Sequence, residues 1–248
     1  QWLRPTVAGQ WRVRDIAAHV IDTMQRRLAI GRDGHRIETG PLESYADVLR
    51  LINGLNATGV DYAARLSPRQ LVESMARVGD DFVTFVSGLP PDGPALFPVA
   101  WAGEAESANW MDIGREYTEH WHHHMQIRDA VGAPRLLLEP RWFHPLMDYS
   151  VRVLPVAYGS TAAAPGSSVV LRIPAGAPQA WSLVAQDGRW HLYEGHATQP
   201  STIVTADADT AWRILYHALS PEQARARVAV EGDATLAEPL LRARSVMV

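Results

Sequence analysis

The chain has 248 residues, a formal net charge of −4 and no cysteine. This length is ample to bury a core in one large domain or two smaller ones. The charge balance gives no electrostatic footprint for nucleic acid, and no Lys/Arg cluster suggests a membrane surface. Because there is also no apolar run of roughly 18 residues and no signal-peptide segment, we expect a cytosolic protein without nucleic-acid or membrane partners.

The absence of cysteine narrows the possible chemistry further. It excludes disulfides, Cys-ligated zinc, iron–sulfur clusters and a cysteine nucleophile. Any bound metal must therefore use His and carboxylate ligands, the set typical of catalytic sites that keep one coordination position open. Any thiol chemistry would need an external thiol.

The first 150 or so residues show the three- and four-residue apolar spacing of helices. Ser44 and Ser67 are candidate N-caps, and Pro68 stands at a first helical position. Gly132 and Pro134 are expected to end the fourth helix. The expected helices cover residues 12–34, 44–66, 67–89, 110–132 and 139–158, the last of them interrupted by Pro145. Four or five helices with moderate connections indicate a bundle.

The remaining residues change character and show β-branched and aromatic alternation. The Asp187-Gly188 pair is a hairpin signal. Strands are expected within residues 167–175, 180–196, 201–207 and 227–233, and helices within 209–219 and 235–248. The small-residue, Gly/Pro-rich stretch 159–168 is the best candidate boundary. We therefore predict a two-domain α+β protein, with a helical domain over 1–158 and a compact α+β domain over 159–248.

Four histidines and two glutamates lie within the nine residues EYTEHWHHH. On a helix, Glu119 and His123 stand over one another, and Glu116 and His120 make a second pair at the same spacing. Consecutive residues point about 100° apart, so the histidine triplet cannot converge on one point. Periodicity does not choose between the pairs, although the apolar neighbours mildly favour Glu116 and His120. A third metal ligand should come from elsewhere, and His19, in the apolar context DIAAHVI, is the best candidate.

Each of these features also has a plainer interpretation. The histidine-rich helix could present a solvated polar face, and His19 could be a core histidine hydrogen-bonded to a carbonyl or carboxylate. A His on one helix together with Glu-x-x-x-His on another is more specific than either alone. It is still shorter than the full zinc-protease motif.

The segment RPTVAGQWRVRDIAAHV carries a family resemblance. It resembles the N-terminal signature of the mycothiol-dependent maleylpyruvate isomerase family, part of the DinB-like metalloenzyme superfamily. In that family a Trp and an Arg-Asp pair lead to a metal-binding His, which matches Trp11, Arg14, Asp15 and His19. The chain begins late in what would be the family's first helix, so the resemblance implies that some sequence precedes Gln1.

A second signature of the family falls on the histidine-rich helix. It is a Glu-x-x-x-His followed by an acidic residue and Ala-x-Gly, and it matches Glu119, His123, Gln126, Ala130 and Gly132. The resemblance thus selects one of the two pairs, against the mild preference of periodicity. It implies a four-helix bundle with a divalent metal, zinc being the expected ion, held by His19, Glu119 and His123.

The resemblance also suggests roles around the metal. Glu116 and His120 could carry protons beside it. Gln126 stands where many relatives have Asp, so outer contacts or substrate contacts should differ. Arg128, with Arg27 as another candidate, could bind carboxylates of the substrate or of the thiol. The C-terminal stretch GDATLAEPLL is similar to the sterol-carrier-like domain often attached to this family.

The function implied is thiol activation. A thiol bound to a metal such as zinc loses its proton near neutral pH, and the family resemblance supplies mycothiol as that thiol. The products would be an S-conjugate of a small electrophile or the cis–trans isomer of an electron-poor alkene. Three alternatives stay open: a thiol-independent metal hydrolase, a non-haem iron enzyme with two His and one carboxylate, and a non-catalytic protein that binds a small ligand. The iron enzymes usually present their ligands from strands, whereas these three residues are expected on helices.

Overall fold

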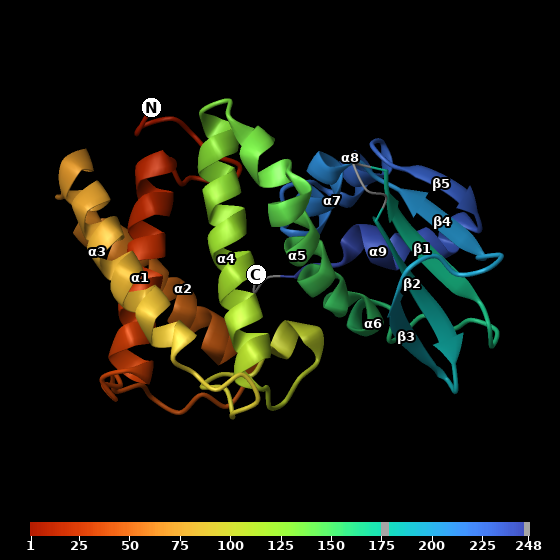
Figure 1. Ribbon diagram of the computed structural model, residues 1–248, viewed down its shortest axis with the longest axis horizontal. Helices are drawn as coiled ribbons and strands as arrows, with labels where there is room; N and C mark the ends of the chain where they lie inside the picture. The colour runs from red at the N-terminus through yellow and green to blue at the C-terminus, as the bar shows by residue number, and fades with distance from the viewer. Residues whose placement is uncertain (175–178, 246–248) are drawn as a thin grey trace.

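The computed structural model describes residues 1–174 and 179–245. A helical N-terminal part is followed by a smaller part built on a mixed sheet, which confirms the predicted α+β fold class (Figure 1). The N-terminal helices are α1 (Val13–Gly31), α2 (Tyr45–Ala63), α3 (Pro68–Ser87), α4 (Asn109–Ala130), α5 (Pro140–Ser150) and α6 (Leu154–Ala157). Short 3-10 turns lie at η1 (Ala100–Ala102), η2 (Pro134–Leu138) and η3 (Val151–Val153). Across the described residues, no helix combines the length and the apolar character that a membrane crossing requires.

Within its described residues, the C-terminal part contains the strands and four short helical segments. The strands are β1 (Ser168–Ile173), β2 (Gln179–Gln186), β3 (Arg189–Glu194), β4 (Thr202–Thr205) and β5 (Ala229–Gly232). The helical segments are α7 (Ala208–Leu215), α8 (Pro221–Arg225), η4 (Ala234–Ala237) and α9 (Glu238–Arg242). Of the expected strand 167–175 and helix 235–248, residue 175 and residues 246–248 lie outside the described residues.

The strand order is β3-β2-β1-β4-β5, with β1 and β4 parallel and the other neighbours antiparallel. The predicted hairpin joins β2 to β3. Asp187 and Gly188 have φ angles of 52° and 72° there, as a two-residue turn with two left-handed positions requires. The hairpin signal in the sequence is thus confirmed.

Helix capping follows the sequence closely. The amide N–H of Gln70 donates to the Ser67 hydroxyl at 3.3 Å, and the Ser67 amide donates to the Gln70 side chain at 2.8 Å, which closes a capping box. The same Ser-Pro-x-Gln pattern at Ser220 caps α8, a helix that the sequence analysis did not predict.

Pro145 does not interrupt its helix, contrary to the sequence-based expectation. Helix α5 continues through it to Ser150. The proline removes one backbone hydrogen bond, and the burial of Phe143, Leu146 and Met147 in the core outweighs that loss. The chain then tightens into η3 before α6.

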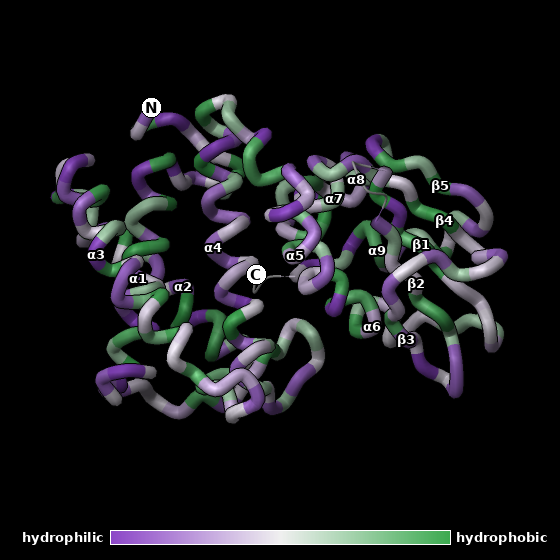
Figure 2. Tube along the Cα trace, viewed as in Figure 1, coloured by the Kyte–Doolittle hydropathy of each residue, from purple (hydrophilic) through white to green (hydrophobic). Residues whose placement is uncertain are grey.

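The largest core joins α4, α5 and the sheet. Trp121 and Met125 of α4 belong to the same buried cluster as Trp181 of β2 and Trp212 of α7. Strands β1 and β4 carry hydrophobic segments in Figure 2, whereas α4 is mostly hydrophilic to neutral there. Helix α6 contacts β3 and α9, although it precedes residue 159. Division of the chain into 1–158 and 159–248 stays a prediction.

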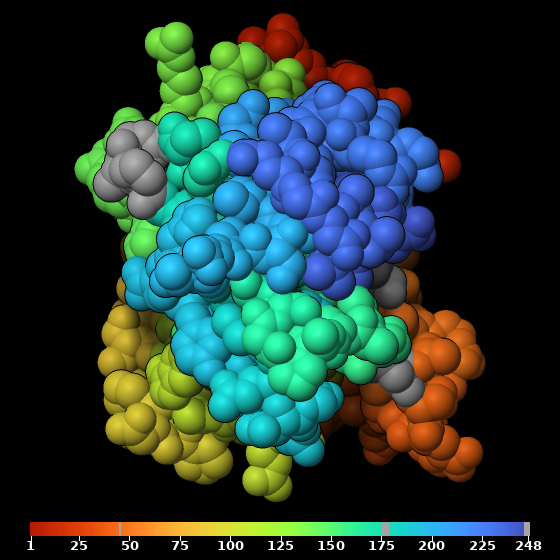
Figure 3. All heavy atoms as spheres, turned by 90° about the vertical axis from the view of Figure 1, so that its right-hand side faces the viewer, coloured from red at the N-terminus to blue at the C-terminus, as the bar shows by residue number. Residues whose placement is uncertain are grey.

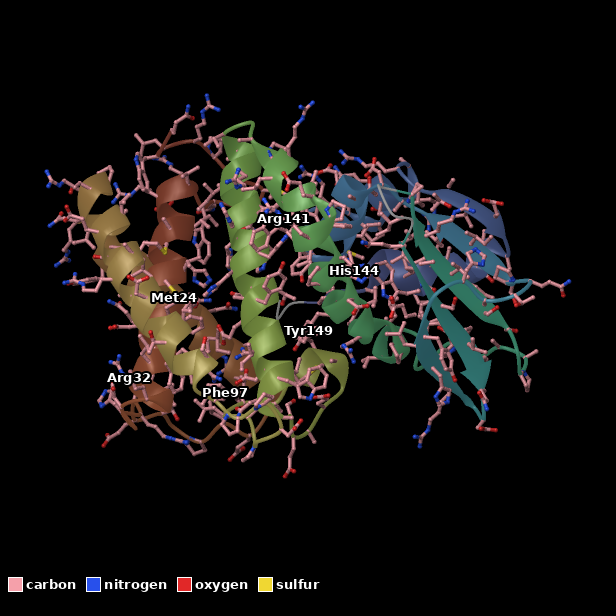
Figure 4. All side chains as sticks on the ribbon, viewed as in Figure 1. Met24, Arg32, Phe97, Arg141, His144 and Tyr149 are labelled. Carbon is pink, nitrogen blue, oxygen red and sulfur yellow. The ribbon has the colours of Figure 1, made fainter. Side chains whose placement is uncertain are left out.

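Helix α4 therefore lies between two groups of elements. On one side it packs against α1, which in turn contacts α2 and α3, and on the other side against α5 (Figure 1). Close approach to α5 depends on Gly114, where an added Cβ would lie 2.2 Å from the Tyr149 ring. Tyr149 points from α5 toward α4 in Figure 4, and its hydroxyl donates to the Met111 carbonyl. Seen from the sheet side, the C-terminal segments cover the central part of the helices behind them (Figure 3).

Candidate metal centre

Helices α1 and α4 bring His19, Glu119 and His123 together. One potential ligand atom from each residue lies within 4.8 Å of the other two. The Glu119 Oε1 atom is 3.1 Å from His123 Nε2 and 3.5 Å from His19 Nε2. These are the three residues that the family resemblance selected, and their role as ligands is taken up below as a proposal.

The two distances from Glu119 fit edges of a coordination tetrahedron. Ligand bonds of about 2.0–2.1 Å to zinc at tetrahedral angles separate neighbouring ligand atoms by about 3.3 Å. The two distances from Glu119 Oε1, 3.1 and 3.5 Å, bracket that value, and the ligand atoms of the two histidines lie within 4.8 Å of each other. Two imidazole nitrogens and one carboxylate oxygen are also a donor set that zinc and other divalent transition ions accept.

The hydrogen bonding of His123 supplies a second argument for a cation. Its Nδ1 lies 2.8 Å from the Gln126 side-chain oxygen, so the Nδ1–H donates there and the neutral ring carries a lone pair on Nε2. That lone pair faces the Glu119 carboxylate at 3.1 Å. Two acceptors facing each other at this distance repel unless a proton or a metal ion lies between them. A divalent cation therefore fits the arrangement.

Burial favours the neutral form of His19. Desolvation lowers the pKa of His19, although the Glu119 carboxylate opposes that effect. Burial would raise the pKa of Glu119, but the neighbouring imidazoles of His123, His122 and His19 hold it well below its usual range. A neutral imidazole at His19 and an ionised carboxylate at Glu119 are protonation states that metal binding requires.

Access to the cluster is through Glu119. Its side chain is 34% exposed, whereas the side chains of His19 and His123 are 4% and 7% exposed. Among the three residues the carboxylate therefore faces the solvent, and an external ligand would approach from that side. A three-residue donor set with one open side is the arrangement of catalytic zinc sites rather than closed structural ones.

Three neighbours contact the two imidazoles. Gln126, for which the sequence indicated an outer contact or a substrate contact, accepts a hydrogen bond from His123; its predicted contact with the thiol or the substrate stays a prediction. The Trp11 ring packs on His19 with a centroid separation of 4.8 Å. The His122 ring lies 3.9 Å from the His123 ring, and its Nδ1–H donates to the Thr118 carbonyl at 3.1 Å. Trp11 and Gln126 had a sequence signal, their places in the two family signatures, whereas His122 had none.

The second Glu/His pair of α4 lies beside this cluster. Glu116 accepts a hydrogen bond from Arg115 at 2.8 Å, and Arg27 lies 4.0 Å from the same carboxylate. The His120 ring packs against Phe82 of α3 and lines a groove of about 700 Å³ between α1, α3 and α4. The predicted role of Glu116 and His120 as proton carriers is not tested by these contacts and stays a prediction.

The two arginines considered for substrate binding have different surroundings. Arg128 is near the end of α4, where it donates to His124 at 2.9 Å and to the Ala133 carbonyl at 3.1 Å. Arg27 is only 5% exposed and is paired with the fully buried Asp112. The role of Arg128 as a thiol or substrate contact stays a prediction, whereas the contacts of Arg27 are those of a buried ion pair.

The metal-free protein is expected to lose stability in acid partly through His122. Burial, followed by the neighbouring His123, lowers the pKa of this ring from 6.5 to about 3. The unfolded chain therefore takes up a proton below about pH 6.5 that the folded state excludes. The stabilisation is complete above that pH and is lost progressively as the pH falls toward 3.

Urea unfolding in the presence of a chelator measures this effect. Between pH 7 and pH 5 the wild-type protein should lose about 2 kcal/mol more unfolding free energy than His122→Phe, which has no group to protonate at this position. Equal losses in the two proteins would contradict the prediction.

The sequence matches one family of known proteins. The family model described as the mycothiol maleylpyruvate isomerase N-terminal domain matches residues 1–128, just over half of the 248 residues. A search of curated proteins finds no significant match.

Several solved structures are similar to parts of the chain. The sterol carrier protein domain 2 of Helicoverpa armigera is 17% identical with a TM-score of 0.30, over 38% of this chain and 81% of that one. The UbiJ-SCP2 ubiquinone synthesis protein is 13% identical with a TM-score of 0.28, over 42% of this chain and 91% of that one. The inverting sec-alkylsulfatase Pisa1 from Pseudomonas sp. is 15% identical with a TM-score of 0.30, over 94% of this chain and 44% of that one.

Proposed function

Because the chain belongs to the mycothiol maleylpyruvate isomerase N-terminal domain family, we propose that it is a metal-dependent enzyme acting with a small thiol. The thiol is mycothiol or a close chemical relative, and the second substrate is a small electrophile. The observation that carries this proposal is the convergence of His19, Glu119 and His123, with two acceptors of the cluster facing each other at 3.1 Å.

The proposal gives each residue of the cluster a task. His19 and His123 would supply neutral nitrogen ligands, and Glu119 would supply the anionic oxygen and the solvent-facing side. Gln126 would keep the His123 Nε2 lone pair directed into the site by accepting the Nδ1–H. A divalent cation bound there, zinc being the expected ion, lowers the pKa of a thiol that reaches it, so that the thiol reacts as a thiolate.

The thiolate chemistry has two outcomes that share a first step. Sulfur adds to one carbon of an electron-poor C=C bond, and the electron pair moves onto the adjoining carbonyl group. If the new C–C single bond rotates and the C–S bond then breaks, the alkene returns with the opposite geometry and the thiolate is regenerated. If a proton is taken up at carbon instead, the product is an S-conjugate. The protein contains no cysteine, so the thiol must come from outside.

A direct assay tests this function. Zinc-loaded protein is incubated with mycothiol and either maleylpyruvate or a simple thiol-reactive electrophile, and isomer and S-conjugate are quantified. We expect turnover that requires both the thiol and the metal. Turnover that persists without thiol would favour the hydrolase alternative, and oxygen uptake with bound iron would favour the oxygenase alternative.

A further inference from the structure

A stack of aromatic rings connects the candidate metal centre to the C-terminal part of the chain. The ring of Tyr216, the residue that follows α7, stacks on His122 with a centroid separation of 4.9 Å and an interplanar angle of 25°. The His122 ring in turn lies 3.9 Å from the ring of His123. Tyr216, His122 and His123 are each no more than 6% exposed. The stack is therefore shielded from solvent along its length.

The far end of this stack is fixed by hydrogen bonds between the end of α5 and the C-terminal part, and within the C-terminal part. The Tyr216 hydroxyl lies 2.6 Å from the hydroxyl of Ser150, at the end of α5. Ser245 donates its own hydroxyl to the Ser150 carbonyl at 2.8 Å, and its amide donates to the carbonyl of Leu215 at 2.8 Å. Ser150 and Ser245 are 0% and 1% exposed. Tyr216 thus has little freedom to move.

The near end of the stack contacts His123, whose ring orientation decides where its Nε2 atom points. His123 can be a metal ligand only if its Nε2 points at Glu119 and His19, and one hydrogen bond to Gln126 leaves the ring free to tilt about that contact. The His122 ring donates a hydrogen bond to the Thr118 carbonyl and stacks on the Tyr216 ring. Its position therefore restricts the tilt of His123.

We propose that Tyr216 and His122 are positioning residues of the metal centre, and that the C-terminal part of the chain thereby raises the metal affinity of a site whose ligands all belong to α1 and α4. This inference rests on the proposed function, since it assumes that His123 binds metal. Outer contacts that orient a ligating histidine typically change metal affinity 10- to 100-fold.

The test compares leucine and phenylalanine at two points of the stack in the full chain. Tyr216→Leu and His122→Leu remove an aromatic ring, whereas Tyr216→Phe and His122→Phe keep the stack and remove only polar atoms. Zn²⁺ affinity is measured by chelator competition, and the absorption spectrum of the Co²⁺-loaded protein reports ligand geometry. We expect about 10-fold weaker Zn²⁺ binding and a shifted Co²⁺ spectrum for each leucine variant that folds, and near wild-type values for the phenylalanine variants.

The outcomes separate this inference from the function on which it rests. Folded leucine variants that bind Zn²⁺ as tightly as the wild type, with the same Co²⁺ spectrum, would overturn the inference and leave the function intact. Phenylalanine variants as weak as the leucine variants would also overturn it, because polar contacts rather than stacking would then be responsible. A wild-type protein without Zn²⁺ affinity would overturn the proposed function together with the inference. Circular dichroism identifies variants that do not fold. If the leucine variant at one position does not fold, the comparison of the leucine and phenylalanine variants at the other position tests the inference.

Discussion

Replacing His123 by alanine is expected to weaken Zn²⁺ binding by more than about 100-fold and to abolish thiol-dependent turnover. The ring supplies one of only three donor groups in the cluster, and loss of an outer contact alone costs 10- to 100-fold in affinity. The remaining pair, His19 and Glu119, would hold a metal no better than many surface sites. Elemental analysis of protein purified without a metal-affinity tag, followed by chelator competition, measures the effect.

His124 offers a matched control on the same helix. It is the next residue along α4, but its ring accepts a hydrogen bond from Arg128 at 2.9 Å in an exposed position. His124→Ala should therefore retain the metal content and the turnover of the wild type. If His123→Ala kept its full metal content, or if both variants lost metal equally, the assignment of His123 as a ligand would be wrong.

Spacing along α4 predicted part of the cluster, but it left a choice that the sequence pattern could not make. Helical geometry brings Glu119 under His123 and Glu116 under His120 equally well. Which pair faces α1 depends on how the helix is rotated about its axis. That rotation is set by the packing of Trp121 and Met125 on the opposite side, where they join the core with α5 and the sheet. Only the family resemblance carried this tertiary information into the sequence analysis.

Local sequence patterns did not predict two of the contacts around the cluster, because these two contacts join residues that are distant in the sequence. The partner of His122 has no sequence signal, because Tyr216 lies far away along the chain. The partner of Arg27 has none for the same reason, since Asp112 belongs to another helix. The N-caps Ser44 and Ser67 and the Asp187-Gly188 turn were predicted correctly because their hydrogen bonds join residues only a few positions apart.

The replacement of Asp112 by alanine is expected to lower the free energy of unfolding by about 3–5 kcal/mol. The Asp112 side chain is 0% exposed and is paired with Arg27, and Arg115 donates to it at 2.6 Å. Removal of the carboxylate leaves the guanidinium of Arg27 in the interior, where its Nε and Nη1 atoms already have no hydrogen-bond partner among the described residues. An uncompensated buried charge is among the most destabilising changes a single substitution makes.

An exposed ion pair provides the comparison for Asp112→Ala. Arg69 and Glu73 on α3 are 2.8 Å apart, and their side chains are 88% and 58% exposed. Glu73→Ala should therefore change the unfolding free energy by no more than about 0.5 kcal/mol. Urea unfolding monitored by circular dichroism measures both variants. If Asp112→Ala lowered the free energy of unfolding by less than about 1 kcal/mol, the prediction that burial makes the Asp112–Arg27 pair important for stability would be wrong.

The same pair connects stability to the metal centre. Arg27 and His19 lie on α1, and Asp112 and Glu119 lie on α4, so the ion pair and the cluster join the same two helices about two helical turns apart. A ligand that binds only the folded state adds RT ln(1 + [L]/Kd), or about 2.7 kcal/mol at a hundredfold excess over Kd. Zn²⁺ should therefore restore a large part of the stability lost in Asp112→Ala. It should restore no more than about 0.4 kcal/mol in the double variant Asp112→Ala, His123→Ala, because the second substitution weakens Zn²⁺ binding by more than about 100-fold. Equal recovery in both proteins would place the stabilising metal outside this cluster.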